Sequence, residues 1–289
     1  MTELALGTAQ FGLDYGVANT EGQVSLDSTA DIIAFSREIG IRTLDTAILY
    51  GESEEVLGKV GVTGFRVNSK LPEIPATVDN VDRWVAREVA ESISRLNVTR
   101  LDGLLLHRPA QLNEPRGAEI IAALLNLKSA NLVEKIGVSI YSPGELHGIL
   151  EHDIFDIVQC PFNIIDQRFS RDGWFELLKN SGIEIHTRSA FLQGLLLMPR
   201  PTIPDKFEIW GPIWDEWHDW LTKNKITPLE ACLQFAFSDD RVDRIIVGVN
   251  SLAQLKQIHE MTKDSVGLVF PDISCVDEYL INPSNWGSL

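Results

Sequence analysis

Four polar residues end or follow short apolar runs of the sequence, and each is of a type that takes part in acid–base chemistry. Asp45 ends the run RTLD, Tyr50 comes five residues later, Lys70 ends RVNSK and His107 ends LDGLLLH. The carboxyl ends of parallel barrel strands meet at one mouth, where the active sites of such enzymes form. We therefore expect these four side chains to lie close together.

A tyrosine, a lysine and a carboxylate at one mouth form an acid–base device. The Lys70 ammonium would stabilise tyrosinate and lower the pKa of Tyr50 from about 10 toward the working pH. Asp45 would keep that ammonium charged and oriented. Each residue alone also has a structural explanation, since an Asp can cap a helix, a Tyr can pack in the core, a Lys can be solvated and a His can bond to backbone. It is the combination that favours catalysis.

Short β-type runs alternate with longer helical patterns along the chain. One such pattern is the stretch 79–96, where Val81, Val85, Val89 and Leu96 recur at helical spacing above a polar face. We expect amphipathic helices of this kind to connect the strands. The eight runs expected as strands are 4–6, 41–44, 65–69, 101–106, 135–139, 154–159, 183–187 and 244–247.

Strands separated by helices pair in parallel, because a parallel neighbour is reached only through a long crossover. Eight such units are what a closed barrel needs, and no Gly/Ser/Pro-rich linker divides them. We predict a single (β/α)8 TIM-barrel domain over residues 1–289. A doubly wound dinucleotide fold is disfavoured, because Gly7, Gly12 and Gly16 do not have the spacing of its fingerprint.

Composition excludes several classes of function. With 25 basic and 41 acidic residues the formal charge is -16, which would repel nucleic acid and most simply serves solubility. Cys160, Cys232 and Cys275 stand far apart, so neither a disulfide framework nor a metal site is indicated. No leader sequence and no apolar run of about 20 residues is found. We expect a cytoplasmic protein that binds neither nucleic acid nor membrane.

Residues 43–59, TLDTAILYGESEEVLGK, are similar to the motif around the second strand of the aldo-keto reductase family. The resemblance covers essentially the whole chain. Five further segments resemble the successive strand-end motifs of that family, in its order: LGTAQFG, NSKLP, LDGLLLHRP, IGVSIYS and VQCPFNIID.

This resemblance implies hydride transfer between a nicotinamide cofactor and a small carbonyl compound, the cofactor being NADP(H) with NAD(H) as the alternative. It implies a catalytic tetrad of Asp45, Tyr50, Lys70 and His107, with Tyr50 as the general acid in reduction and His107 orienting the carbonyl. The cofactor contacts that it implies are Gly7, Thr8, Asp45, Ser139, Gln159, Arg188, Ser189, Phe191, Gly248, Asn250, Ser251 and Gln254.

The sequence departs from the family pattern at three places. Ile140 follows Ser139 where the family often has Asn, and Arg188 stands where a Tyr often stacks beneath the nicotinamide. The segment 244–258 resembles the part of the family that grips the adenosine 2'-phosphate. It carries Gln254 where a basic residue is expected, and only Lys256 is left to compensate, although a dianion calls for charge-assisted donors.

The segment 198–221 is rich in proline and tryptophan, and we expect it to form a loop and an added helix before the helical pattern resumes at Thr227. Its tryptophans are expected to pack on the barrel, with Trp210 and Trp214 as secondary candidates for the substrate wall. The chain begins almost directly at the first strand, so something other than the family's N-terminal hairpin should cover the barrel floor. The short tail 270–289 predicts an open substrate pocket.

Two other functions remain as alternatives. Lys70 would serve as the nucleophile of a Schiff-base aldolase if burial left its amine uncharged. The same barrel would also suit a redox-sensing regulatory protein that binds a nicotinamide and turns over slowly, because a fold alone does not fix the chemistry. Tyr50 and Asp45 fit the reductase more naturally than the aldolase.

Overall fold

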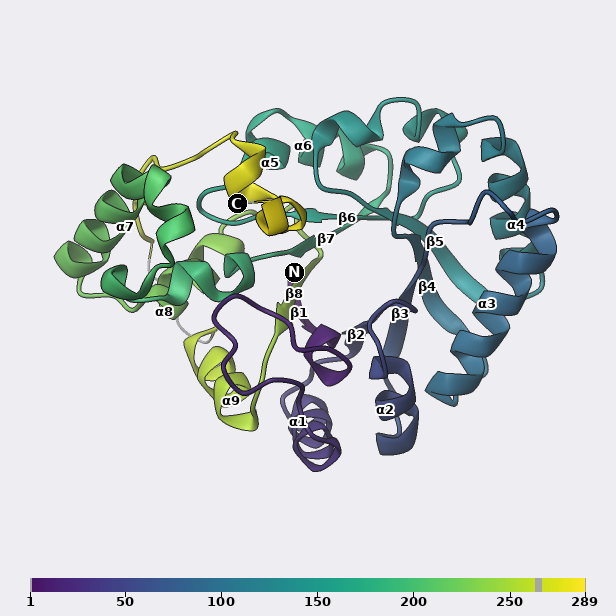
Figure 1. Ribbon diagram of the computed structural model, residues 1–289, viewed down its shortest axis with the longest axis horizontal. Helices are drawn as coiled ribbons and strands as arrows, with labels where there is room; N and C mark the ends of the chain where they lie inside the picture. Colours follow the sequence, from purple (N-terminus) through teal and green to yellow (C-terminus); the bar gives the residue numbers. More distant parts are fainter. Residues whose placement is uncertain (1, 263–266, 289) are drawn as a thin grey trace.

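Eight parallel strands close into a barrel in the computed structural model, which describes residues 2–262 and 267–288 (Figure 1). They pair in sequence order, and β8 returns to β1 with Gly248 opposite Gly7. The predicted single (β/α)8 barrel is confirmed. The strands are β1 (Glu3–Gly7), β2 (Thr43–Asp45), β3 (Arg66–Leu71), β4 (Leu101–Leu106), β5 (Val133–Ser139), β6 (Ile157–Pro161), β7 (Glu184–Arg188) and β8 (Arg244–Gly248).

The sixth strand begins later than its sequence pattern predicts, at Ile157 rather than at residue 154. The residue before it, Asp156, uses its side chain to accept the backbone N–H of Ile136 at 2.8 Å. This hydrogen bond closes the turn that leads into β6. The apolar pair before Asp156, Ile154 and Phe155, therefore belongs to the loop.

Helices surround the strands, as Figure 1 shows. In the predicted helix 79–96, the Asn80 side chain accepts the N–H of Arg83, while Val81, Val85 and Val89 are buried against the barrel. The helices are α1 (Leu26–Glu38), α2 (Ser53–Val60), α3 (Val81–Leu96), α4 (Gly117–Ser129), α5 (Arg168–Arg171), α6 (Trp174–Asn180), α7 (Gly211–Asn224), α8 (Pro228–Ala236), α9 (Leu252–Met261) and α10 (Glu278–Ile281).

The crossover between β5 and β6 departs from the expected pattern, because two short 3-10 turns, Pro143–Leu146 and Leu150–His152, replace an α-helix. Gly148 lies between them with φ of 80°, a conformation that interrupts a helix. Glu145 accepts the backbone N–H groups of Tyr141 and Ser142 and so fixes the first turn directly after β5.

After β7 the chain forms 3-10 turns and the added helix α7, as expected. Trp214 and Trp217 are fully buried, and their indole N–H groups donate to the carbonyls of Phe207 and Leu196. Trp210 donates to Asp277 of the C-terminal segment. The packing role expected for this segment is therefore what the structure shows, and neither Trp210 nor Trp214 lines the main cavity.

The described part of the C-terminal tail, 270–288, packs on the outside of the barrel. Leu280, Ile281 and Trp286 are buried, and Arg168 of α5 pairs with Glu278 of α10. Figure 1 shows this yellow segment beside α5. This described part of the tail contributes no residue to the main cavity, in keeping with the predicted open pocket. The last residue of the predicted tail, Leu289, lies outside the described residues.

Three aspartates hold neighbouring strands together at the amino-terminal edge of the barrel. Each uses a carboxylate oxygen to accept a backbone N–H of the preceding strand at 2.8 Å. They thus satisfy amide groups that the sheet itself leaves unpaired. The donor and acceptor pairs are Val67 with Asp102, Ile136 with Asp156, and Ile185 with Asp243.

Candidate active site

A cavity of about 400 Å³ opens at the carboxyl ends of the strands. Asp45, Tyr50 and His107 line it, while Lys70 lies directly beneath, only 1% exposed. Because β2, β3 and β4 are neighbours in the barrel, the strand ends that carry Asp45, Lys70 and His107 lie side by side. The four residues predicted as a tetrad are therefore brought together.

The Lys70 ammonium has three partners. Its Nζ donates to Asp45 Oδ2 at 2.5 Å and to the Thr46 carbonyl at 2.9 Å, and lies 3.5 Å from the Tyr50 hydroxyl. Burial lowers the pKa of Lys70, and the adjacent Asp45 carboxylate opposes that shift. Asp45 thus supports a charged ammonium at a site that would otherwise favour the neutral amine.

The pKa of Tyr50 lies above its ordinary value. Burial penalises the phenolate and the charge of Asp45 adds to this effect, while Arg188 opposes it. The expectation that the pKa of Tyr50 is lowered toward the working pH is wrong for the protein as it stands, because burial and the charge of Asp45 raise it. Tyr50 therefore holds its proton across the physiological pH range.

His107 faces the Tyr50 ring edge-on, with 5.9 Å between ring centroids. Its Nδ1 is buried and has no hydrogen-bond partner among the described residues. Burial, with Lys70 and Arg188 adding like charge, lowers the pKa of His107 to about 3. The imidazole is thus neutral, with one ring nitrogen protonated and the other able to accept a hydrogen bond.

Two glycines fix the loop that carries Tyr50. A Cβ on Gly12 would lie 1.9 Å from the Tyr50 carbonyl oxygen, and a Cβ on Gly51 would lie 2.2 Å from the Gly12 carbonyl oxygen. Gly51 also has φ of 54°. The loop after β1 and the loop after β2 therefore touch backbone to backbone, which only glycine permits.

A buried hydroxyl cluster secures the same loop from below. Ser53, the first residue of α2, donates to the Thr8 carbonyl at 2.8 Å and lies within 3.2 Å of both the Thr8 and the Thr46 hydroxyls. All three side chains are inaccessible to solvent. Thr8, predicted as a cofactor contact, lines the cavity and also belongs to this cluster.

Most of the predicted cofactor residues line the cavity, and two do not. Gln159 is buried behind it, where its amide donates to Asp45 Oδ1 at 2.7 Å and accepts from Ser139 at 3.1 Å. Ser251 caps the start of α9. The predicted residues that do line the cavity are Gly7, Thr8, Asp45, Ser139, Arg188, Ser189, Phe191, Gly248, Asn250 and Gln254.

Arg188 projects into the cavity over a residue that the sequence analysis missed. Its guanidinium carbon lies 4.1 Å from the centroid of the Tyr141 ring, and one of its nitrogens donates to the Ile140 carbonyl at 3.0 Å. This is the cation–π geometry that a planar guanidinium favours. Tyr141 follows β5 by two residues, the same kind of strand-end position that singled out the other site residues.

Two loops meet over the cavity through further residues that the sequence analysis missed. Gln193, with φ of 53°, donates to the Tyr15 hydroxyl at 3.2 Å, and a Cβ on Gly194 would lie 2.6 Å from that of Ala18. Burial raises the pKa of Tyr15 to about 12, so this hydroxyl stays protonated. The sequence could have pointed to Tyr15 and Gln193 only through the glycines that follow them, Gly16 and Gly194, both of which have positive φ.

The end of the cavity formed by the loop after β8 is neutral. The Gln254 side chain accepts the backbone N–H of Asn250 at 2.8 Å, and Lys256 instead lies over the Phe35 ring outside the cavity. Among the described residues, Arg188 is the one Lys or Arg that lines the cavity. The compensation expected from Lys256 is therefore not seen.

Residues 3–266 match the sequence model of the aldo/keto reductase family. The chain belongs to that family. Members of the aldo/keto reductase family are NAD(P)H-dependent carbonyl reductases, and the chain is accordingly an oxidoreductase that uses a nicotinamide cofactor on a small carbonyl compound. No helix within residues 2–262 and 267–288 is long and apolar enough to cross a membrane.

Relatives in the aldo/keto reductase family include two curated enzymes and a solved structure. The chain is 25% identical to an NADH-specific methylglyoxal reductase of Escherichia coli (strain K12), over 68% of this chain and 65% of that protein. It is 26% identical to a D-threo-aldose 1-dehydrogenase of a Pseudomonas species, over 88% of this chain and 89% of that protein. An aldo-keto reductase of Bacillus halodurans in its holo form is similar in fold, with a TM-score of 0.74, 19% identity and coverage of 94% and 89%.

Proposed function

We propose that the protein reduces a small aldehyde or ketone with Tyr50 as the proton donor. One observation carries this proposal: a protonated Tyr50 and a neutral His107 face the same cavity, with the Lys70–Asp45 ion pair 3.5 Å behind the Tyr50 hydroxyl. A carbonyl oxygen between these two side chains would accept the phenolic proton. His107, which also lines the cavity, would orient that oxygen through a protonated ring nitrogen.

Lys70 would act after the proton leaves. The O–H bond of Tyr50 breaks, the carbonyl oxygen gains the proton, and the electron pair stays on the phenolate. The ammonium then stabilises the new negative charge across the 3.5 Å that separates Nζ from the Tyr50 oxygen. Asp45 keeps Lys70 charged for this role, and Gln159 orients Asp45 through its second oxygen.

Two features of the cavity suit a nicotinamide dinucleotide: the residues that line it and one buried polar atom that lacks a hydrogen-bond partner. Asn250 Oδ1 is buried without a partner among the described residues, and Gly7 and Gly248 line the cavity at the ends of β1 and β8. When bound, the nicotinamide supplies the hydride. We propose that the cofactor is held by the predicted residues that line the cavity: Gly7, Thr8, Asp45, Ser139, Arg188, Ser189, Phe191, Gly248, Asn250 and Gln254.

The neutral loop after β8 supports NAD(H) more than the NADP(H) first expected. A 2'-phosphate is normally met by Arg or Lys, whereas Gln254 is engaged with Asn250 and Lys256 with Phe35. The NADH specificity in the name of the Escherichia coli relative agrees with this choice. We therefore propose that NADH binds at least as tightly as NADPH.

Small polar carbonyl compounds are the substrates that we propose. The two relatives act, by name, on methylglyoxal and on an aldose, and the described tail leaves the cavity mouth uncovered. The Schiff-base alternative has less support, because Lys70 does not line the cavity and its amine is engaged by Asp45 and Thr46. We further propose that residues 1–289 act as one domain in the cytoplasm, where the free cysteines stay reduced.

The test combines cofactor binding with turnover. Purified protein is titrated with NADH and with NADPH by quenching of tryptophan fluorescence, and methylglyoxal reduction is followed for the wild type and for Tyr50→Phe. We expect NADH to bind no more weakly than NADPH, and the variant to bind cofactor normally while its kcat falls by at least about 100-fold. Failure of both nucleotides to bind, or full activity of Tyr50→Phe, would refute the proposal.

A further inference from the structure

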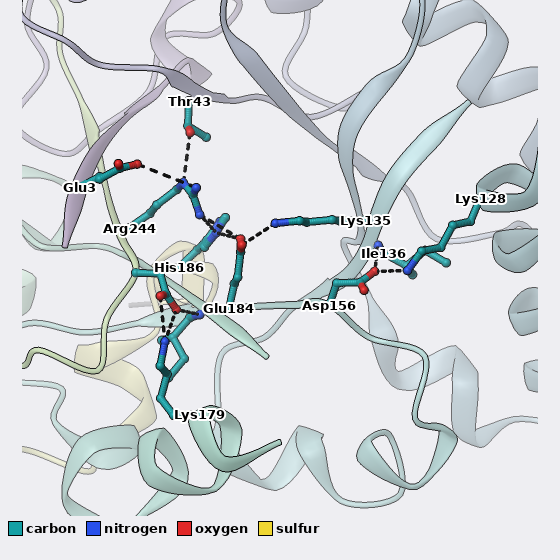
Figure 2. Close-up of polar contacts among 12 residues, drawn as sticks. Glu3, Thr43, Lys128, Lys135, Ile136, Asp156, Lys179, Glu184, His186 and Arg244 are labelled. Atoms are coloured by element: carbon teal, nitrogen blue, oxygen red, sulfur yellow. Dashed lines mark hydrogen bonds and ion pairs between the residues drawn. The ribbon is translucent and has the colours of Figure 1, made fainter. Parts of the chain in front are cut away.

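A second, smaller cavity of about 90 Å³ lies at the opposite end of the barrel, where the strands begin. Figure 2 shows part of its polar lining, Thr43, Lys135, Glu184, His186 and Arg244, with Glu184 and Arg244 at the centre of the network. Three basic residues, Arg66, Lys135 and Arg244, and three acidic residues line this floor cavity. The mechanism proposed above uses none of them.

The carboxylates of the floor cavity are already engaged. Glu184 pairs with Lys135 through one oxygen and with Arg244 through the other, at 2.9 Å. Asp102 accepts a backbone N–H of β3, and Glu134 pairs with Arg100 at 2.6 Å. Each of the three carboxylates thus already has a basic side chain or a backbone N–H as its partner.

His186 supplies a donor that lacks an acceptor. The ring is 1% exposed, and burial lowers its pKa, so it is neutral. His186 Nε2 lies 3.0 Å from Arg244 Nη1 and 3.2 Å from Glu184 Oε2. Because Oε2 already accepts from Arg244 at 2.9 Å and a guanidinium N–H can only donate, we assign Nε2 as the acceptor and place the ring proton on Nδ1. That Nδ1 has no partner among the described residues.

Other donors at the floor are free as well. The Thr43 hydroxyl accepts from Arg244 Nε at 3.1 Å, which leaves its own hydrogen without an acceptor among the described residues. Arg66 forms no ion pair with any described residue, and the buried Asn68 side chain makes no hydrogen bond with one. A neutral cavity wall would not need so many unmatched donors.

We propose that the floor cavity binds a small oxyanion, either inorganic phosphate or a small carboxylate. Such a ligand supplies several acceptor oxygens at once to Thr43, His186 and the guanidinium groups of Arg66 and Arg244. Guanidinium groups recognise both kinds of oxyanion through paired N–H donors. The cavity is too small for a nucleotide, and no group of three or more His, Cys, Asp or Glu among the described residues is placed to hold a metal ion.

This site lies directly below the catalytic residues within the barrel. Asn68 is the register partner of Asp45, and His186 is the register partner of Gln159, which donates to Asp45. An anion that contacts Asn68 would therefore lie next to the β3 residue that pairs with Asp45 and that precedes Lys70 by two positions. The proposal concerns binding alone and does not depend on the reaction at the mouth.

Binding is measured by proton nuclear magnetic resonance on the whole protein, with sodium phosphate, acetate and chloride compared at pH 7 and constant ionic strength. The imidazole signal of His186 is identified by its absence in His186→Gln. We expect a saturable shift of that signal with phosphate or with acetate, and a rise in the thermal midpoint of unfolding over the same concentrations. A response to phosphate alone assigns a phosphate site, and one to acetate assigns a carboxylate site.

Two matched variants test the assigned residues. Arg66→Gln removes a lining charge from an exposed residue without a partner, and we expect it to weaken binding by at least about fivefold. Arg42→Gln removes the same charge close by from a residue that does not line the cavity, and should leave binding unchanged. The site is overturned by the absence of a saturable shift, by an equal response to chloride, or by equal effects of the two variants.

Discussion

His107 is the residue of the cavity whose protonation state the fold controls most clearly. Its pKa falls to about 3, because burial and the positive charges of Lys70 and Arg188 disfavour the imidazolium. A charged imidazolium at this position would compete with Tyr50 as the proton donor. The buried setting thus leaves the phenol as the acid and the imidazole as a neutral partner.

Acid should destabilise the protein partly through His107. The folded-state pKa lies below the value of about 6.5 in the unfolded chain, so the unfolded state binds more protons between these values and stability falls as the pH drops through that window. Between pH 7 and pH 5 the contribution is about 2 kcal/mol. Urea unfolding of the wild type and of His107→Gln at both pH values measures it.

The variant should lose less stability on acidification than the wild type, while the buried His186 contributes equally to both proteins. Equal losses would mean that His107 is already charged in the folded protein, and the proposed division of roles between Tyr50 and His107 would then be wrong.

At the scale of elements, the position of Tyr50 depends on the contact between the loops after β1 and β2. Gly51 combines a positive φ with a close approach to Gly12, and Ser53 ties the same loop to Thr8. The catalytic geometry is therefore a property of two loops held together, since a shift of about 1 Å at a reacting group is costly.

Substitution of Gly51 by Ala should reduce turnover more than it reduces overall folding. Its Cβ would lie 2.2 Å from the Gly12 carbonyl oxygen, so the two backbones must separate and Tyr50 must move. We expect kcat to fall by at least about tenfold. Gly22→Ala is the matched control, because Gly22 also has positive φ, at 77°, but has no atom within 4 Å of the added Cβ.

Both variants share the conformational cost of an Ala in the left-handed region, about 1 kcal/mol. Only the first has the steric conflict, so steady-state kinetics of the two proteins separate the effects. If both lose the same activity, the contact between the loops has no catalytic role.

Sequence patterns located the residues at strand ends but missed those whose position depends on loop conformation. Asp45, Lys70 and His107 were predictable because strand order alone fixes their neighbours. Tyr15 and Gln193 meet only because the loop after β7 adopts unusual backbone angles, which no periodic pattern encodes. The pKa of Tyr50 was mispredicted because it is raised first by burial, which is a property of the folded cavity.

For the whole molecule, the alternation of strands and helices was sufficient to predict the closed barrel. Eight parallel strands with crossovers have few other ways to pair. The crossover of 3-10 turns after β5 was not foreseen, because its Pro, Gly and capping Glu145 act locally rather than through a period. Stability at the barrel floor likewise depends on single side chains, above all the aspartates that bond to neighbouring strands.

Removal of one floor aspartate should weaken the entire barrel without affecting the reaction. Asp156→Ala leaves the Ile136 N–H and the Lys128 ammonium without their acceptor, and we expect the free energy of unfolding to fall by about 1–3 kcal/mol. Asp240→Ala, which removes a carboxylate without a side-chain contact among the described residues, should leave stability unchanged. Urea denaturation and methylglyoxal kinetics distinguish the two variants.

Tyr50 and the facing wall of the main cavity come from different loops. Tyr50 is fixed by backbone contacts to Gly12 and by Ser53, whereas the facing wall comes from the loop 189–197. Evolution can therefore change the loop 189–197, and with it the substrate specificity, while Tyr50 keeps its position beside Lys70. The same separation makes Gln193 and Leu197, which line that wall, natural positions to randomise in a library that seeks altered specificity at constant chemistry.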